Sequence, residues 1–195
     1  MHSQFQNSFG ILIAYVLPGS IVVAGLSWHW PLLGTWLHAE PTLEPSVGGF
    51  LYASMAALTA GLITSAIRWA VIDSLHHYSG LPTPQFDFTR LPDRLESFSL
   101  AVEHYYRYYQ FYANTLIAEA IFAACYLSAG GSISFRLAAV GLCVGAILFV
   151  ASRDSLRRYY TRVSLLLGTF HPLPPSILGF VLSESPFELR NQVQD

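Results

Sequence analysis

Residues 47–69 read VGGFLYASMAALTAGLITSAIRW, and Arg68 is the only charged side chain in this stretch. An α-helix that crosses the hydrocarbon core of a bilayer needs about 20 mainly apolar residues. A helix that is apolar around its whole circumference is either buried in a large protein or placed in a membrane. The stretch therefore predicts a transmembrane helix.

Three further apolar stretches have a similar length and cover residues 9–28, 111–130 and 133–152. Of the 195 residues, 53% are hydrophobic and 11% are charged, whereas a soluble domain carries about 25% charged residues. The sequence thus predicts an all-α, polytopic membrane protein with a four-helix transmembrane bundle. Pro18 and Gly19 interrupt the first span, where a membrane helix tolerates a kink.

The ten basic residues are all arginines, and they are distributed unevenly about these spans. If the N-terminus is cytoplasmic, nine of the ten lie in or beside cytoplasmic segments, and only Arg136 lies on the far side. The positive-inside rule then predicts that both termini are cytoplasmic. The first span lacks a positive n-region and a cleavage site, so we expect a retained anchor. The expected location is the bacterial inner membrane.

The cytoplasmic segments contain two predicted helical extensions. The loop at 73–109 begins with proline-rich turn sequence, but from Asp93 onward apolar residues recur every three or four positions and continue into the third span. Residues 153–168 extend the fourth span in the same way. We expect the extensions either to pack together as a stalk or to lie along anionic lipid head groups. Residues 1–168 then form the transmembrane domain, and residues 169–195 form a proline-broken tail.

Small residues recur with a period of four in two of the spans. This spacing lets helix backbones approach closely, which is how helices associate in lipid. The pattern predicts packing faces, either within one chain or between the chains of an oligomer. The residues are Ala53, Ala57, Gly61 and Ser65 in the second span, and Gly141 and Gly145 in the fourth.

Glu119 lies about midway along the third span, where an ionised side chain costs roughly 3 kcal/mol or more. Asn114 and Thr115 precede it on the same span. One hypothesis is that these three residues form an intramembrane polar face that lines an ion or proton path. The alternative is that a protonated Glu119 is hydrogen-bonded to a neighbouring helix and locks the packing.

Six arginines are predicted to lie at the cytoplasmic interface, where long side chains can extend to the head groups. They are Arg68, Arg107, Arg153, Arg157, Arg158 and Arg162. Four residues at about the same membrane level offer nitrogen and oxygen ligands, namely Asp73, His76, His77 and His104. They are weak candidates because no HExxH motif or cysteine supports them, so no metal or other cofactor is predicted.

The sequence contains no nucleophile elbow, phosphate-binding loop or dinucleotide fingerprint. We therefore nominate no catalytic residue, and an enzyme is the less favoured class. No basic patch accompanies a nucleic-acid-binding motif, so nucleic acid is not an expected partner. The expected partners are the lipid bilayer, a second copy of the chain and a soluble cytoplasmic protein.

Two functions fit these features. The first is a small membrane subunit that assembles with itself or with a cytoplasmic partner and serves as an anchor, sensor or membrane effector, for example in a bacterial defence system. The second is an oligomeric ion or proton channel, or a small transporter, that uses the face containing Glu119.

Overall fold

The computed structural model describes residues 10, 12–37 and 47–168, and no β-strand occurs among them. Three helical segments are long and apolar enough to cross a membrane, namely Val47–Tyr78, Pro92–Ser128 and Phe135–Leu167. These segments indicate an integral membrane protein. A shorter apolar helix covers Leu12–Leu26 within the first predicted span. The predicted tail at 169–195 lies outside the described residues.

The first apolar helix consists of a π-helical turn, η1 (Leu12–Val16), followed by α2 (Leu17–Leu26), with Pro18 in the first turn of α2. Proline has no N–H with which to continue the hydrogen bonds of the preceding turn. The carbonyl of Ala14, four residues before Pro18, instead accepts a hydrogen bond from the Asn114 side chain at 2.8 Å. The interruption predicted at Pro18 is therefore stabilised by a different helix. A short helix, α3 (Pro31–Leu37), follows.

The long segment Val47–Tyr78 begins with α4 (Val47–Arg68), which crosses the shorter apolar helix at very short range. A Cβ atom on Gly61 would overlap the carbonyl oxygen of Tyr15, and one on Gly19 would overlap that of Ala57. Both obstructing atoms belong to the backbone. Ala57 and Gly61 of the predicted small-residue face therefore pack within one chain, against η1 and α2. Ala53 and Ser65 lie beside this contact and are partly buried.

The helix does not end at the predicted boundary of the second span. It continues through a π-helical turn, η2 (Trp69–Asp73), and through α5 (Ser74–Tyr78). The connection from 79 to 91 contains one 3-10 turn, η3 (Phe88–Arg90), in which the Asp87 carboxylate accepts hydrogen bonds from the hydroxyl and backbone N–H of Thr89. These hydrogen bonds hold the pKa of Asp87 below its usual range.

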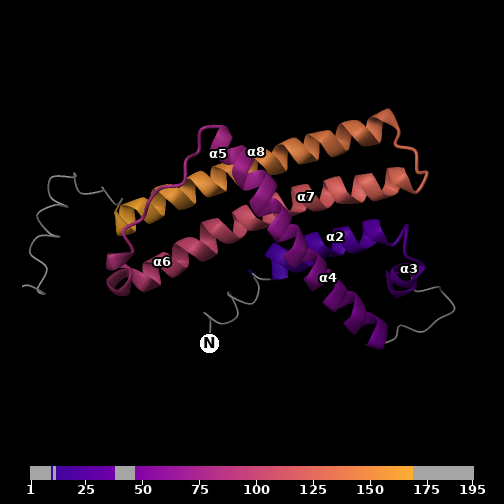
Figure 1. The fold of residues 1–195 in the computed structure, drawn as a ribbon, viewed down its shortest axis with the longest axis horizontal. Helices are drawn as coiled ribbons and strands as arrows, with labels where there is room; N and C mark the ends of the chain where they lie inside the picture. The colour runs from indigo at the N-terminus through magenta and orange to yellow at the C-terminus, as the bar shows by residue number, and fades with distance from the viewer. Residues whose placement is uncertain (1–9, 11, 38–46, 169–195) are drawn as a thin grey trace, which may run out of the picture.

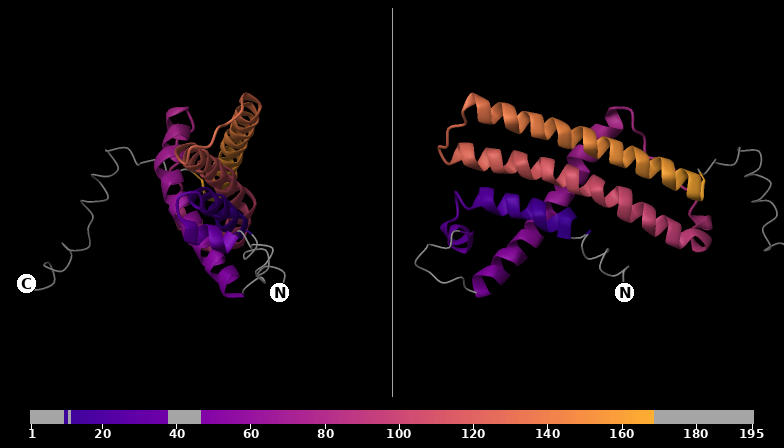
Figure 2. Two further views of the ribbon diagram at one scale, coloured as in Figure 1. Left: turned by 90° about the vertical axis from the view of Figure 1, so that its right-hand side faces the viewer. Right: turned by 180° about the vertical axis from the view of Figure 1, so that it is seen from behind.

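The long segment Pro92–Ser128 contains four consecutive pieces: η4 (Pro92–Arg94), α6 (Leu95–Ala101), η5 (Val102–Tyr106) and α7 (Arg107–Ser128). A tight turn, in which Gly130 adopts a φ of +85°, leads to α8 (Phe135–Leu167). The Ser134 side chain caps the start of α8 by accepting a hydrogen bond from the N–H of Leu137. α7 and α8 lie side by side as a long hairpin, and α4 crosses them (Figures 1 and 2).

The two predicted extensions pack against each other. Ala101 of α6 lies in one buried apolar cluster with Val163 and Leu167 of α8, and Phe98 and Tyr105 cover this cluster. The two segments therefore pack together, which is one of the two arrangements that the sequence left open. We call the paired segments 92–106 and 153–167 the stalk. They continue the α7–α8 hairpin beyond its crossing with α4 (Figure 1).

Candidate functional site: a buried polar junction

Five polar side chains meet where α4 and α5 cross the α7–α8 hairpin. We call this group the polar junction, and it consists of Arg68, Asp73, His76, Tyr109 and Ser152. Its members come from three long helices, so the junction forms only when the chain is fully folded.

Arg68 and Asp73 form the charged part of the junction. Arg68 is 4% exposed, and its Nη1 donates to Asp73 Oδ1 at 2.9 Å. Tyr109 of α7 donates its hydroxyl hydrogen to the same carboxylate oxygen. The guanidinium carbon lies 5.0 Å from the centre of the Tyr109 ring, which allows a cation–π interaction. The expectation that Arg68 extends towards lipid head groups is therefore wrong, because its charge is paired inside the protein.

The π-helical turn η2 explains how Arg68 reaches Asp73. Residues five apart lie about 140° apart around an α-helix, so their side chains diverge. A π-turn contains an extra residue, and its backbone hydrogen bonds join residues five apart. Residues 69–73 form such a turn directly after Arg68. The wider turn thus brings the Asp73 carboxylate within hydrogen-bond distance of the Arg68 guanidinium.

His76 and Ser152 form the neutral part of the junction. His76 is fully buried, and its Nε2 lies 3.0 Å from Ser152 Oγ on α8. The Ser152 Oγ also lies 2.8 Å from the Phe149 carbonyl oxygen, to which the hydroxyl can donate its hydrogen. With the hydroxyl in that orientation its oxygen accepts from His76 Nε2, so the tautomer of His76 is tied to the rotation of the Ser152 hydroxyl.

Burial makes the junction costly to disturb. The Arg68 side chain is 5% exposed and that of Asp73 is 31% exposed. Removing the carboxylate would leave the buried charge of Arg68 uncompensated, and loss of one partner of a buried ion pair costs about 3–5 kcal/mol. Arg68 Nε and His76 Nδ1 are buried without a hydrogen-bond partner among the described residues. The junction therefore fixes how α4 and α5 sit on the hairpin.

Glu119 lies away from the junction, between α7 and α8. A Cβ atom on Gly141 would lie 3.4 Å from Glu119 Oε1, and one on Gly145 would lie 3.6 Å from Oε2. The two predicted packing glycines thus face the Glu119 carboxyl group. Its Oε2 is buried and has no hydrogen-bond partner among the described residues. A Cβ atom at either glycine would make only an ordinary contact with the carboxyl group, which lies between the two helices.

Asn114 and Glu119 contact different helices. The fully buried Asn114 donates to the Ala14 carbonyl of η1, whereas Glu119 faces α8. Thr115 donates its hydroxyl hydrogen to the Phe111 carbonyl, one turn earlier in its own helix. Asn114 has a structural role that follows from Pro18. Asn114 Oδ1 and Glu119 Oε2 are both buried without a hydrogen-bond partner among the described residues.

The weak metal candidates lie in different environments. Asp73 and His76 belong to the polar junction, whereas His77 and His104 are exposed. No group of three or more potential His, Cys, Asp or Glu ligands occurs in the described ranges.

The remaining interfacial arginines also have separate environments. Arg107 lies beside Gly10, and its buried Nε has no hydrogen-bond partner in the described part of the chain. Arg153 donates to the Ser79 carbonyl at 2.8 Å. The last three line a cavity on the stalk, namely Arg157, Arg158 and Arg162.

Sequence reasoning missed Tyr109 and Ser152, which complete the junction. Tyr109 was expected only as part of an apolar helix face, and Ser152 only as the end of a span. The one available signal was Asp73, a carboxylate five residues after an arginine at the end of an apolar helix. Comparison with models of protein families, with curated proteins and with solved structures finds no match to this chain.

Proposed function

We propose that the chain is a small membrane subunit with four spans, both termini in the cytoplasm and a place in the bacterial inner membrane. It assembles with itself or with a soluble cytoplasmic partner as an anchor, sensor or membrane effector. The shorter helix Leu12–Leu26 supplies the remaining span. In support, the end of α2, the start of α4 and the α7–α8 turn lie towards one end of the molecule (Figure 1).

The observation that carries the assembly role is the apolar surface at the free end of the stalk. Phe88, Leu95 and Leu165 are 56%, 60% and 74% exposed. They lie near the start of the long segment Pro92–Ser128 and the end of α8, beyond the apolar stretch that ends at residue 152. Lipid covers exposed apolar side chains along the spans but not here. Large apolar side chains exposed to water are typical of a protein-binding surface.

The test is the mass of the protein purified from its host membrane in mild detergent. We expect an assembly heavier than one chain, and the double variant Leu95→Glu/Leu165→Glu should reduce it to a single chain. Ser99→Glu is the matched control, because it places the same charge at an exposed polar position of α6. A wild-type protein that is a single chain without a partner would overturn the proposal.

A second candidate is an oligomeric ion or proton channel, or a small transporter. The supporting observation is the unpaired Oε2 of Glu119 beside Gly145, since polar groups inside a membrane commonly mark a transport path. In liposomes, the wild type should pass ions or protons and Glu119→Gln should not. An intact oligomer without flux would contradict this candidate and leave the assembly role standing.

A further inference from the structure

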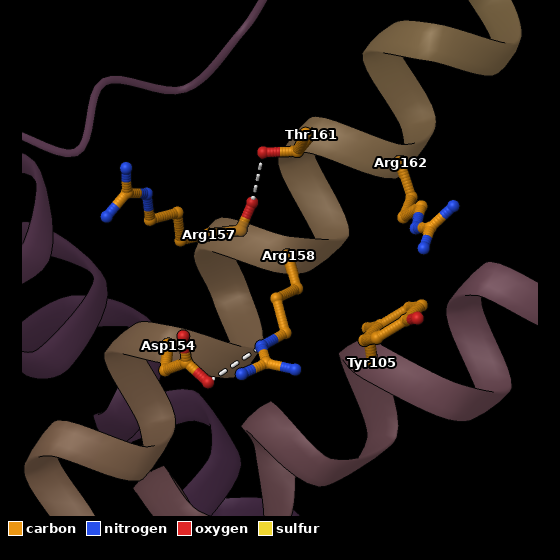
Figure 3. Close-up of a pocket in the computed structure, with 6 residues that line it drawn as sticks. All are labelled: Tyr105, Asp154, Arg157, Arg158, Thr161 and Arg162. Carbon is orange, nitrogen blue, oxygen red and sulfur yellow. Dashed lines mark hydrogen bonds and ion pairs between the residues drawn. The ribbon is translucent and has the colours of Figure 1, made fainter.

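The stalk carries a cavity of about 260 Å³ between α8 and η5. Its lining is mainly basic and consists of Tyr105, Asp154, Arg157, Arg158, Thr161 and Arg162. The Arg158 and Arg162 side chains extend from α8 on the side that faces Tyr105, whereas the Arg157 guanidinium points away from that ring (Figure 3). The two guanidinium groups and the phenol ring therefore border one space.

Asp154 holds Arg158 in place without occupying all its donors. Asp154 Oδ2 lies 2.8 Å from Arg158 Nε, one helical turn away on α8. One terminal nitrogen of Arg158 lies on the Tyr105 side of the guanidinium and the other on the Asp154 side (Figure 3), and no hydrogen bond or ion pair engages either of them within the described ranges. A guanidinium held at Nε presents its terminal nitrogens as a fork, which suits the oxygen atoms of a phosphate group.

Arg162 adds a second cation one turn beyond Arg158. It forms no ion pair or hydrogen bond with its side chain among the described residues. Like charges four residues apart on a helix destabilise it, by about 0.2–0.5 kcal/mol. This arrangement does not serve stability, but it suits the binding of an anion that bridges both guanidinium groups.

Tyr105 supplies a fixed wall and a neutral donor. Its ring packs against the buried cluster that contains Ala101 and Val163, so its position is set by the stalk core. Its hydroxyl lies on the Arg162 side of the ring (Figure 3). Arg158, Arg162 and the Tyr105 phenol thus line one cavity, and arginine forks are a common way to hold a phosphate group.

We propose that Arg158, Arg162 and Tyr105 bind the phosphate group of an anionic membrane lipid. The apolar stretch of α8 ends at about residue 152, so Arg158 and Arg162 lie roughly 9 Å and roughly 15 Å farther along the helix. The head-group region is about 5–8 Å thick on each side, so Arg158 lies just beyond it, where its side chain can extend back to a head group, and Arg162 lies one turn farther out. This site goes beyond the proposed assembly role, because a single chain carries all three residues.

The test is titration of the full-length protein in neutral detergent with phosphatidylglycerol, with phosphatidylcholine as the zwitterionic reference. Bound lipid is counted by native mass spectrometry. We expect phosphatidylglycerol to bind more tightly than phosphatidylcholine. Arg162→Gln should weaken phosphatidylglycerol binding about tenfold, because a charge-assisted hydrogen bond is lost. Tyr105→Phe should weaken it about threefold, since only a neutral donor is removed.

Arg157→Gln is the control for a diffuse basic surface. Arg157 belongs to the lining of the cavity, but its side chain points away from Tyr105 (Figure 3), so the change removes the same charge from the same helix and leaves the three proposed contacts in place. Its phosphatidylglycerol affinity should stay within about twofold of the wild type. Equal losses in Arg157→Gln and Arg162→Gln would overturn the site in favour of a diffuse basic surface. Inorganic phosphate that displaces the lipid at equal concentration would overturn the assignment to a lipid. Neither result depends on whether the chain assembles.

Discussion

Arg68 and Asp73 form an ion pair across a single π-helical turn, with Nη1 and Oδ1 2.9 Å apart. The pair is formed within one helix, and Tyr109 then joins it to α7. The π-helical turn η2 thus places a carboxylate where it can join two helices. Asp73 accepts hydrogen bonds from Arg68 and from Tyr109 of α7, and the position of α4 on the hairpin depends on it.

We expect Asp73→Asn to lower the free energy of unfolding by about 3 kcal/mol, because the buried Arg68 loses its counter-charge. Thermal unfolding in detergent, followed by circular dichroism, measures the change. Asp154→Asn is the matched control, since its carboxylate forms an exposed pair with Arg158, and it should cost less than about 1 kcal/mol. Similar losses for the two variants would show that burial of the Arg68 pair is unimportant.

Gly61→Ala should prevent the close crossing of α4 and η1, because the new methyl group meets the Tyr15 backbone. We expect the free energy of unfolding to fall by about 3 kcal/mol, at the upper end of the usual cost of overpacking, since backbone atoms cannot move aside as a side chain can. Gly34→Ala on α3 is the control, because its methyl group makes only an ordinary contact at 3.8 Å. The melting temperatures of the two variants provide the comparison, and an unchanged Gly61→Ala protein would contradict the crossing.

Leu167→Ala should destabilise the stalk by about 2–4 kcal/mol, because Leu167 is fully buried between α8 and α6. Leu165→Ala, two residues earlier and largely exposed, should change stability by less than about 0.5 kcal/mol. Protease sensitivity of the stalk measures the difference. If both variants are cut equally fast, the two extensions do not form the paired structure.

Cysteine labelling tests the four-span orientation. In a background with Cys125→Ala and Cys143→Ala, Ser132→Cys in the α7–α8 turn should react with an impermeant maleimide on cells with a permeable outer membrane. Ser97→Cys on α6 should react only after the inner membrane is opened. Both positions are exposed in the structure, so accessibility within the protein does not explain a difference. Labelling of both from outside would refute the orientation.

The long apolar helices could be predicted because each span carries its own evidence. A run of about 20 apolar residues predicts a helix without knowledge of its neighbours. The α8 part of the stalk could also be predicted as a helix, since Val163 and Leu167 are spaced with a helical period. Its partner helix shows the same kind of pattern, although periodicity alone did not decide between packing and lipid contact.

The polar junction could not be predicted because its contacts depend on tertiary structure. Tyr109 lies 36 residues after Asp73, and His76 lies 76 residues before Ser152. The period of an α-helix places the side chains of Arg68 and Asp73 on different faces. No sequence pattern in residues 69–73 predicts a π-turn. For the same reason, Asn114 and Glu119 looked like members of one face, whereas they contact different helices.

α8 is one unbroken helix of 33 residues, which corresponds to a rod of about 50 Å. His76 contacts it at Ser152, with Gly141 towards one end and Leu165 towards the other. A rigid rod of this length carries a displacement of one end to the other. A tilt of about 10° about Ser152 would move the Leu165 end by roughly 3–4 Å and the Gly141 end by roughly 3 Å in the opposite direction. Gly141 lies beside Glu119, so the stiffness of one helix links the far end of the stalk to the surroundings of that carboxyl group.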